Sequence, residues 1–164
     1  VGPLVPEVGT NVAGATPYAE RPDETAAVEG RITRTLSGAR ASRGVRFGAS
    51  THVARLLLAV REHEPGVRFA ADYRCDERVT AALDVLDAPV AEFDSAGAAT
   101  DPAGNGDADA VERGVDSALA AVEGTPAAVV DRSGSGGEPL VYLLGGDADQ
   151  LIERTRAVLD GMGE

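Results

Sequence analysis

Apolar positions along the chain follow two different periodicities. Residues 51–63, 76–86 and 110–122 repeat apolar side chains at helical spacing, and a fourth helix follows the capping-box pattern of Asp147 and Gln150. The last helix is expected to turn five residues inward: Leu151, Ile152, Thr155, Val158 and Leu159. Short β-prone or apolar runs predict strands over residues 30–35, 44–47, 66–73, 89–93, 126–130 and 140–144.

The alternation of strands and helices predicts an α/β fold in which helices cover a largely parallel or mixed sheet. Residues 95–109 lack apolar periodicity and are expected to form a flexible surface loop. The 164 residues are most simply one domain, 1–164, with a single core. Because the chain opens with Val1 rather than Met, we expect it to be a C-terminal fragment of a longer polypeptide or a processed product.

The charge pattern indicates which partners the chain would bind and in what salt concentration it would work. All 15 basic residues are arginine, and against 27 acidic residues they leave a net charge of -12. Such a domain is not expected to bind nucleic acid through bulk electrostatics. Excess carboxylate, the lack of lysine and the abundance of Ala, Gly and Val indicate adaptation to concentrated salt, where screening relieves self-repulsion. The composition is therefore that of a halophilic protein.

Cysteine usage and hydropathy bear on the compartment. Cys75 is the single cysteine, so the chain forms neither an intrachain disulfide nor a cysteine metal cluster. This fits a reducing cytoplasm or a spare thiol. No apolar run approaches the roughly 18 residues that cross a bilayer, and no signal peptide is visible. We expect a cytoplasmic protein with no membrane partner.

The turn "FGASTH", which joins a predicted strand to the helix over residues 51–63, is the first candidate site. Gly48 and the small residues after it would leave the first N–H groups of the helix free to hold a phosphate, with Ser50 or Thr51 capping the helix or donating to an anion. His52 would then face the ligand. The simpler interpretation is an ordinary N-cap with His52 as a solvated first-turn residue, and the spacing leaves both open.

Other candidates are weaker on spacing alone. Arg31, at the start of a predicted strand, suits bidentate phosphate recognition or a surface ion pair. Gly136 and Gly137, in "DRSGSGGEP", would let backbone amides approach a phosphate or simply form a flexible turn. Asn11 lies in a polar turn that is uninformative by itself. His63, at the other end of the His52 helix, is too distant to share a metal.

Five blocks resemble one family in order and spacing. They are "LVPEVGTNVAGATPYA", "AAVEGRI", "RFGASTHVARLLLAVREHEP", "VRFAADYR" and "AVVDRSGSGGEPLVYLLG". Together they resemble the archaeal-type thiamine-phosphate synthase (ThiN) domain over nearly the whole chain. The resemblance implies a three-layer α/β/α fold with a mixed sheet, similar to the class II aldolase and epimerase group. It also implies condensation of hydroxymethylpyrimidine diphosphate with hydroxyethylthiazole phosphate, which yields thiamine phosphate and pyrophosphate.

The resemblance assigns catalytic roles to Arg31 and His52. It implies that pyrophosphate lies at the helix start, where Arg31 stabilises the departing charge and His52 donates a hydrogen bond or a proton. Asn11, Gly48, Ser50, Thr51, Arg74, Gly136 and Gly137 are expected to bind substrate or phosphate. No resident cofactor or metal is expected, and magnesium would accompany the diphosphate.

Departures from the family pattern support an alternative. Gly136 and Gly137 stand where members often have a Gly-Lys pair, and Asp72 stands where members have an asparagine. Active members often carry methionine on or just after the helix that bears the histidine, whereas the single methionine here is Met162. These changes favour a thiamine phosphate sensor, since the domain also occurs behind a helix-turn-helix in transcriptional repressors. The retained Arg31 and His52 favour the synthase, which is found behind a pyrimidine kinase. A covalently fused upstream domain and a homodimer are further expected partners.

Overall fold

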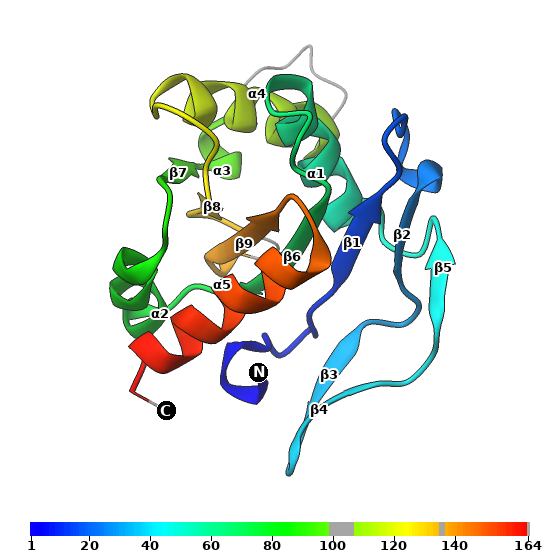
Figure 1. The fold of residues 1–164 in the computed structure, drawn as a ribbon, viewed down its shortest axis with the longest axis vertical. Helices are drawn as coiled ribbons and strands as arrows, with labels where there is room; N and C mark the ends of the chain where they lie inside the picture. The colour runs from blue at the N-terminus through cyan, green and yellow to red at the C-terminus, as the bar shows by residue number, and fades with distance from the viewer. Residues whose placement is uncertain (99–106, 135–136, 164) are drawn as a thin grey trace.

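The computed structural model describes residues 1–98, 107–134 and 137–163, and it places a β-sheet between two layers of helices (Figure 1). Seven strands lie in the order β5-β2-β1-β6-β9-β8-β7. Their bounds are β1 Val12–Ala15, β2 Thr25–Val28, β5 Val45–Phe47, β6 Phe69–Arg74, β7 Val90–Phe93, β8 Ala128–Asp131 and β9 Leu140–Gly145. Each pair of neighbours is antiparallel except β7 and β8. The expected mixed sheet is confirmed.

Of the two sheets that the pattern allowed, largely parallel or mixed, the structure has the mixed one, in which β7 and β8 are parallel and the other neighbours antiparallel. Antiparallel strands need only a short connection, whereas parallel strands need a crossover of a dozen or more residues. The glycine-rich segment between β8 and β9 is a connection of the first kind. Strands β7 and β8 are parallel, and the chain between them includes helices.

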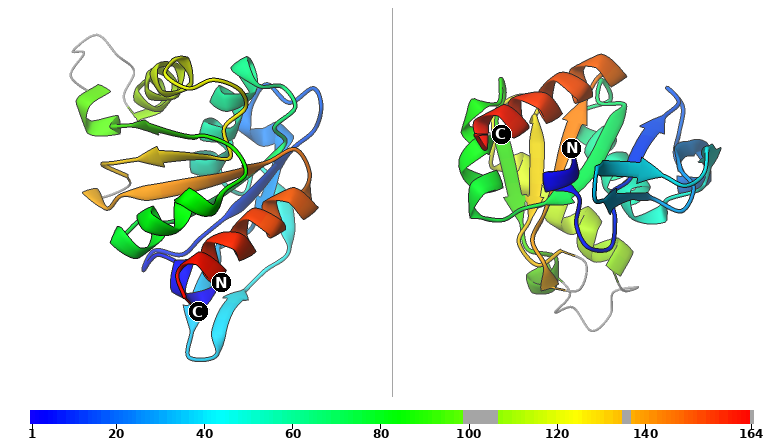
Figure 2. Two further views of the ribbon diagram at one scale, coloured as in Figure 1. Left: turned by 60° about the vertical axis from the view of Figure 1, so that its left-hand side comes forward. Right: turned by 90° about the horizontal axis from the view of Figure 1, so that it is seen from below.

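Helices cover both faces of the sheet (Figure 2). Helices α1 Thr51–His63 and α4 Asp107–Ala120 lie on one face, and α2 Glu77–Ala82 and α5 Ala148–Gly161 lie on the other. Short helical turns complete the set: η1 Gly2–Leu4, η2 Pro22–Glu24, η3 Leu83–Val85 and α3 Ser95–Ala98. Alternate residues of β6 serve the two cores, since Ala70 packs under α1 while Ala71 and Tyr73 pack under α5.

Helix α1 has the predicted bounds, and its local chemistry explains them. The hydroxyl of Ser50 accepts a hydrogen bond from the backbone N–H of Val53, which caps the first turn. Arg61 and His63 in the last turn complement the negative end of the helix dipole. The buried stripe fixes the helix against β1 and β6: Val53, Ala54, Leu56, Leu57, Ala59 and Val60.

One inward assignment on α5 is wrong. Leu151, Thr155 and Val158 are buried and Leu159 is partly buried, but the side chain of Ile152 is 48% exposed. A residue one position after Leu151 is rotated by about 100° around the helix axis, which takes it off the buried stripe. Arg154 occupies the stripe instead, where its guanidinium donates to the backbone oxygen of Leu144 at 2.7 Å.

The elements missed by the sequence are short and rich in small residues. Strands β1 and β2 have the sequences VAGA and TAAV, and alanine and glycine are depleted in strands generally. The predicted strand over residues 30–35 is β3 Ile32–Thr35, which pairs with β4 Gly38–Ala41 in a hairpin outside the seven-stranded sheet, and Ile32 also bridges to Thr10. The predicted helix over residues 76–86 ends at Ala82 and continues as η3.

The segment 95–109 is not a loop throughout. Residues 95–98 form α3, and α4 already begins at Asp107, three residues before the predicted start. The rest of the predicted loop, residues 99–106, lies outside the described residues. Among the helices that the described residues form, none is both long and apolar enough to span a bilayer.

Substitution of Gly114 tests how closely α4 packs against Phe93 of β7. A Cβ atom at Gly114 would lie 2.2 Å from a ring carbon of Phe93. Gly114→Ala should therefore lower the free energy of unfolding by about 1–2 kcal/mol, because overpacking outweighs the usual gain of alanine over glycine in a helix. The measurement is chemical denaturation in molar salt. Ser117→Ala, at an exposed position of the same helix, is the control and should be neutral or stabilising. A Gly114→Ala protein more stable than the wild type would contradict this packing.

Candidate active site

The turn before α1 folds as a capped helix start. Gly48 has a φ of 72°, in the region that favours glycine, and its N–H donates to the backbone oxygen of Thr25 at 2.9 Å. Ser50 is the N-cap residue and is buried, whereas Thr51 is exposed. The N-cap interpretation is thus confirmed for Ser50. It does not compete with an anion site, because the hydroxyl accepts from Val53 and keeps its own hydrogen to donate.

His52 is not a solvated surface residue. Its Nε2 lies 2.6 Å from the hydroxyl oxygen of Tyr142 on β9, and the ring centroids are 5.8 Å apart. Burial lowers the pKa of His52, an effect that the nearby carboxylate of Asp72 partly offsets. His52 is therefore neutral at pH 7, with one nitrogen bound to Tyr142. Burial also raises the pKa of Tyr142, so its hydroxyl stays protonated.

A buried carboxylate lies beside this pair. Asp72 on β6 is directly opposite Tyr142 on β9, and it is 2% exposed. The backbone N–H of Asn11 donates to Oδ1 of Asp72 at 2.6 Å, and the hydroxyl of Thr10 donates to the backbone oxygen of Asp72. Burial raises the pKa of Asp72, while the hydrogen bond from the Asn11 N–H and the charge of Arg31 lower it. Asp72 is thus a fixed acceptor in the middle of the sheet.

A second buried carboxylate, that of Asp131, lies at the end of β8. Asp131 is 3% exposed, and its Oδ1 accepts the backbone N–H groups of Ser95 and Ser133, each at 3.1 Å. The charge of Asp131 raises the pKa of His52, as that of Asp72 does. The neutral imidazole of His52, in the first turn of α1, is therefore influenced by two buried acids.

Arg31 reaches the same site from another part of the chain. It follows β2 in the left-handed conformation, with a φ of 66°, which is uncommon outside glycine. Its Nη1 donates to the backbone oxygen of Gly9 at 3.4 Å, and no carboxylate among the described residues forms an ion pair with it. Its charge lowers the pKa of both His52 and Asp72. Arg31 thus lies near enough to His52 for its charge to affect the protonation of the imidazole.

Asn11 is engaged with the protein backbone. Its amide nitrogen donates to the backbone oxygen of Val28 at 3.0 Å, and its amide oxygen accepts the N–H groups of Val28 and Val12. The side chain therefore joins β1 to β2, and its backbone N–H holds Asp72. The expected ligand contact of Asn11 stays a prediction.

The other expected phosphate-binding residues gather at a different place. Arg74, two positions after Asp72 on β6, pairs with Asp76 at 3.3 Å and lines a hollow of about 580 Å³ with Arg132 and Pro139. Gly137, with a φ of 84°, lies near this segment in the chain, and Gly136 falls outside the described residues. Neither Arg31 nor His52 lines this hollow. A phosphate-binding role for Arg74 and Gly137 stays a prediction.

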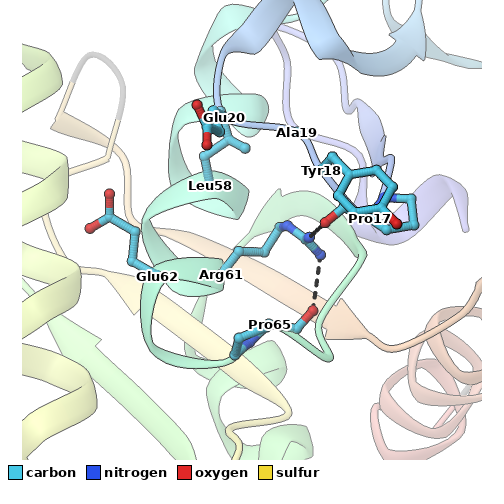
Figure 3. Close-up of a pocket in the computed structure, with 8 residues that line it drawn as sticks. All are labelled: Pro17, Tyr18, Ala19, Glu20, Leu58, Arg61, Glu62 and Pro65. Atoms are coloured by element: carbon cyan, nitrogen blue, oxygen red, sulfur yellow. Dashed lines mark hydrogen bonds between the residues drawn. The ribbon is translucent and has the colours of Figure 1, made fainter.

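A further hollow of about 590 Å³ lies at the far end of α1 (Figure 3). Arg61 spans it and donates to the backbone oxygens of Pro17 and Pro65, each at 3.1 Å. Its guanidinium is thus committed to holding two loops together. Arg61 lies nine residues from His52, which is about 13 Å along the helix, so this hollow is separate from the candidate site.

The described residues include no cluster of three or more His, Cys, Asp or Glu side chains arranged to hold a metal ion. His63, at the end of α1, instead contacts Asp116 of α4 at 2.6 Å. Cys75 is buried, and burial raises the pKa of its thiol, which disfavours a reactive thiolate.

The fold is that of an α/β domain in which the first turn of a capped helix carries a neutral histidine on which the charge of Arg31 acts. The chain belongs to the thiamine-phosphate synthase ThiN family, whose model matches residues 1–157.

Two curated relatives agree with this assignment. Thiamine-phosphate synthase ThiN of Methanothermobacter thermautotrophicus is 32% identical over 158 residues, which cover 96% of this chain and 83% of that protein. The bifunctional thiamine biosynthesis protein ThiDN of Methanocaldococcus jannaschii is 30% identical over 156 residues. That alignment covers 94% of this chain but only 36% of the relative, so the bifunctional protein is much longer.

Solved structures confirm the fold. The crystal structure of a C-terminal domain of phosphomethylpyrimidine kinase matches with a TM-score of 0.84 and 25% identity, over 95% of this chain and 88% of that one. An aldolase II superfamily protein from Pseudomonas syringae matches with a TM-score of 0.52 and 10% identity, over 98% of this chain and 67% of that one. The second likeness concerns the fold alone, and it bears out the expected similarity to the class II aldolase group.

Two residues of the site escaped the sequence analysis, and a third was noted only as a departure. Tyr142 lies in the apolar run "LVYLL" and Asp131 ends another apolar strand, so both resemble core or turn residues in sequence. Asp72 carried a usable signal, because a carboxylate inside "FAADY" must be buried if the strand is central. Their meeting depends on strand order, which the local pattern does not contain.

The lowered pKa of His52 predicts how the free energy of unfolding depends on pH. The unfolded chain, with an ordinary histidine pKa near 6.5, binds this proton more readily than the folded protein does. Stability from the neutral histidine is therefore present above pH 6.5 and is lost as the pH falls toward the folded pKa. His52→Gln removes this loss, so the difference in free energy of unfolding should move in favour of the variant between pH 7.5 and 5.5. A difference that stays constant over this range in denaturation experiments would contradict the burial of His52.

Proposed function

We propose that the chain condenses hydroxymethylpyrimidine diphosphate with hydroxyethylthiazole phosphate to form thiamine phosphate and pyrophosphate. Membership of the thiamine-phosphate synthase ThiN family supports the reaction. The structural observation that supports the proposal is that the charge of Arg31 acts on a neutral His52 in the first turn of α1. The relatives place the same chemistry in archaea, and we assign it to the cytoplasm.

In the proposed reaction the thiazole nitrogen attacks the methylene carbon of the pyrimidine. A carbon–nitrogen bond forms while the bond from that carbon to the diphosphate oxygen breaks, and the bonding electrons leave with the diphosphate. Negative charge therefore grows on the leaving group. The free N–H groups of α1 and the guanidinium of Arg31 would stabilise this charge, and the neutral His52 would donate a hydrogen bond to it.

Tyr142 and Asp72 have supporting roles in this proposal. The hydroxyl of Tyr142 occupies one nitrogen of His52, which leaves the other nitrogen to face the ligand. The carboxylate of Asp72 would stabilise the positive charge that develops on the pyrimidine methylene as the diphosphate leaves. Magnesium would enter with the diphosphate, since this cation commonly keeps substrate phosphates among its ligands.

The proposed partners follow from the relatives. The long ThiDN relative and the kinase title of a structural neighbour support a fused upstream kinase domain. The small-molecule partners would be the phosphorylated pyrimidine, the phosphorylated thiazole and thiamine phosphate. A second copy of the chain is also proposed as a partner.

One observation favours a second candidate function, a thiamine phosphate sensor. Asp72 and Asp131 bring two buried carboxylates close to the place where a diphosphate would lie, and their repulsion opposes its binding. A ligand with a single phosphate and a cationic ring would suit these charges better. Two measurements in molar salt test this function: calorimetry for the binding of thiamine phosphate, and an assay for pyrophosphate release from the two substrates. Binding without pyrophosphate release would support the sensor.

Substitution of Arg31 and of His52 tests the proposed site. Arg31→Ala should lower the rate of pyrophosphate release by about 10²–10³-fold, as expected when a charge-stabilising donor is removed. His52→Ala should lower it by about 10²–10⁴-fold. The controls are Arg21→Ala, an exposed arginine in an ion pair with Asp23, and His63→Ala at the far end of α1. Full activity in either site variant would contradict the assignment.

Tyr142→Phe separates positioning from binding. The variant keeps the ring in the core and removes only the hydroxyl that contacts His52. The loss of one hydrogen bond of about 1 kcal/mol should lower kcat by roughly fivefold to tenfold while KM changes little. Steady-state pyrophosphate release at several pH values measures both constants. A rise in KM with an unchanged kcat and pH profile would show that Tyr142 does not act through His52.

A further inference from the structure

A largely apolar hollow lies between α5 and the sheet, on the face opposite α1 (Figure 2). Its volume is about 410 Å³, which is within the range of small-molecule pockets. Strands β1 and β6 and helix α5 supply its apolar walls: Val12, Phe69, Tyr73, Leu151, Ile152 and Leu159. We call it the α5 hollow. The side chain of Ile152 is 48% exposed, so the hollow opens to solvent.

One side of α5 carries the charged group of this hollow. Ile152, Arg156 and Leu159 are spaced i, i+4 and i+7, which places them on one side of the helix. The methylene stem of Arg156 therefore extends the apolar surface, while its guanidinium lies at the open edge. The residues that line the hollow include no acid.

The guanidinium of Arg156 has no ion-pair or hydrogen-bond partner within the described part of the chain. In three other hollows an arginine is already engaged: Arg61 with backbone oxygens, Arg132 with Glu92 and Arg154 with Asp87. The α5 hollow thus combines apolar walls with a cation that is free to bind a ligand.

The two hydroxyl groups at the hollow are already used within the protein. Thr155 donates to the backbone oxygen of Leu151 at 2.8 Å, and the hydroxyl oxygen of Tyr73 lies 3.3 Å from that of Thr155. Because the Thr155 hydrogen is engaged, Tyr73 donates to Thr155. A ligand therefore meets one set of free donors, those of the Arg156 guanidinium, and otherwise apolar walls.

We propose that the α5 hollow binds a small amphiphilic carboxylate, with its alkyl or aryl body against Phe69 and Ile152 and its carboxylate on the guanidinium of Arg156. A guanidinium matches a carboxylate through two parallel hydrogen bonds. A phosphate monoester brings more charge and more acceptor oxygens than one guanidinium satisfies. Since concentrated salt screens the ion pair, burial of the apolar body supplies most of the affinity.

The α5 hollow is separate from the proposed active site. Successive residues of β6 point to opposite faces of the sheet, so Tyr73 faces the hollow while Asp72 lies on the face of Tyr142 and His52. The sheet therefore stands between the two sites. Binding at the α5 hollow does not depend on the proposed catalytic function.

Isothermal titration calorimetry of the wild-type chain in molar potassium chloride tests the proposal, with octanoate as the probe. Octanoate should bind at one saturable site, about tenfold more tightly than hexanoate, because each buried methylene adds apolar contact. 1-Octanol has the same alkyl body and no charge, and it should bind about tenfold more weakly than octanoate. Equal affinities for octanoate and 1-octanol, or no saturable binding of octanoate, would overturn the proposal.

Substitutions separate the roles of charge and apolar surface. Arg156→Gln should lower the affinity for octanoate about tenfold and leave that for 1-octanol unchanged. Ile152→Ser, at a half-exposed position, should weaken both ligands. Arg34→Gln, at an exposed arginine of β3 outside the hollow, is the control and should bind as the wild type does. Circular dichroism checks the fold of each variant. An Arg156→Gln protein with wild-type affinity for octanoate would sink the assignment.

Competition separates the proposed ligand from other occupants of the hollow. Saturating thiamine phosphate should leave the affinity for octanoate unchanged, whereas displacement would place octanoate in the proposed active site. The affinity should also be independent of protein concentration, and it should be the same in the longest natural polypeptide that contains this chain. A weaker affinity in either case would show that a second copy or another part of that polypeptide fills the hollow. Any of these three results would contradict the proposal.

Discussion

The hydrogen bond between Tyr142 and His52 is the contact on which the proposed site depends. It ties the first turn of α1 to β9 in the middle of the sheet, and it does so with two buried groups whose neutral forms are favoured by burial. Asp72 lies opposite Tyr142 on the adjacent strand and is held by the backbone N–H of Asn11. A contact between residues 90 positions apart in sequence thus fixes one imidazole at the first turn of α1.

Charges of both signs act on the imidazole of His52. Two buried carboxylates favour its protonation, while burial and the charge of Arg31 oppose it, and burial has the largest effect. Because salt screens a buried group less than an exposed one, this balance should persist in the concentrated salt that the composition indicates. The acidic surface and the site therefore answer to different constraints. The excess of acidic residues suits concentrated salt, and burial keeps His52 neutral.

The sequence predicted the parts of the fold that repeat an apolar pattern and missed the parts that do not. Helix α1 was found with its correct bounds because Ser50 caps it and its stripe is regular. Strands β1 and β2 were missed because alanine and glycine give no strand signal. Arg31 and His52 were identified through the family resemblance, whereas Tyr142 and Asp131 were not, because only the strand order brings apolar strands and their polar residues to one place.

Catalysis by the site at the α1 N-terminus is the central claim, and one assay addresses it directly. Hydroxymethylpyrimidine diphosphate and hydroxyethylthiazole phosphate are mixed with the wild-type chain in molar salt, and thiamine phosphate and pyrophosphate are both quantified over time. The account predicts that the two products accumulate in a ratio of one to one over many turnovers. Tight binding of thiamine phosphate with no formation of either product would contradict it.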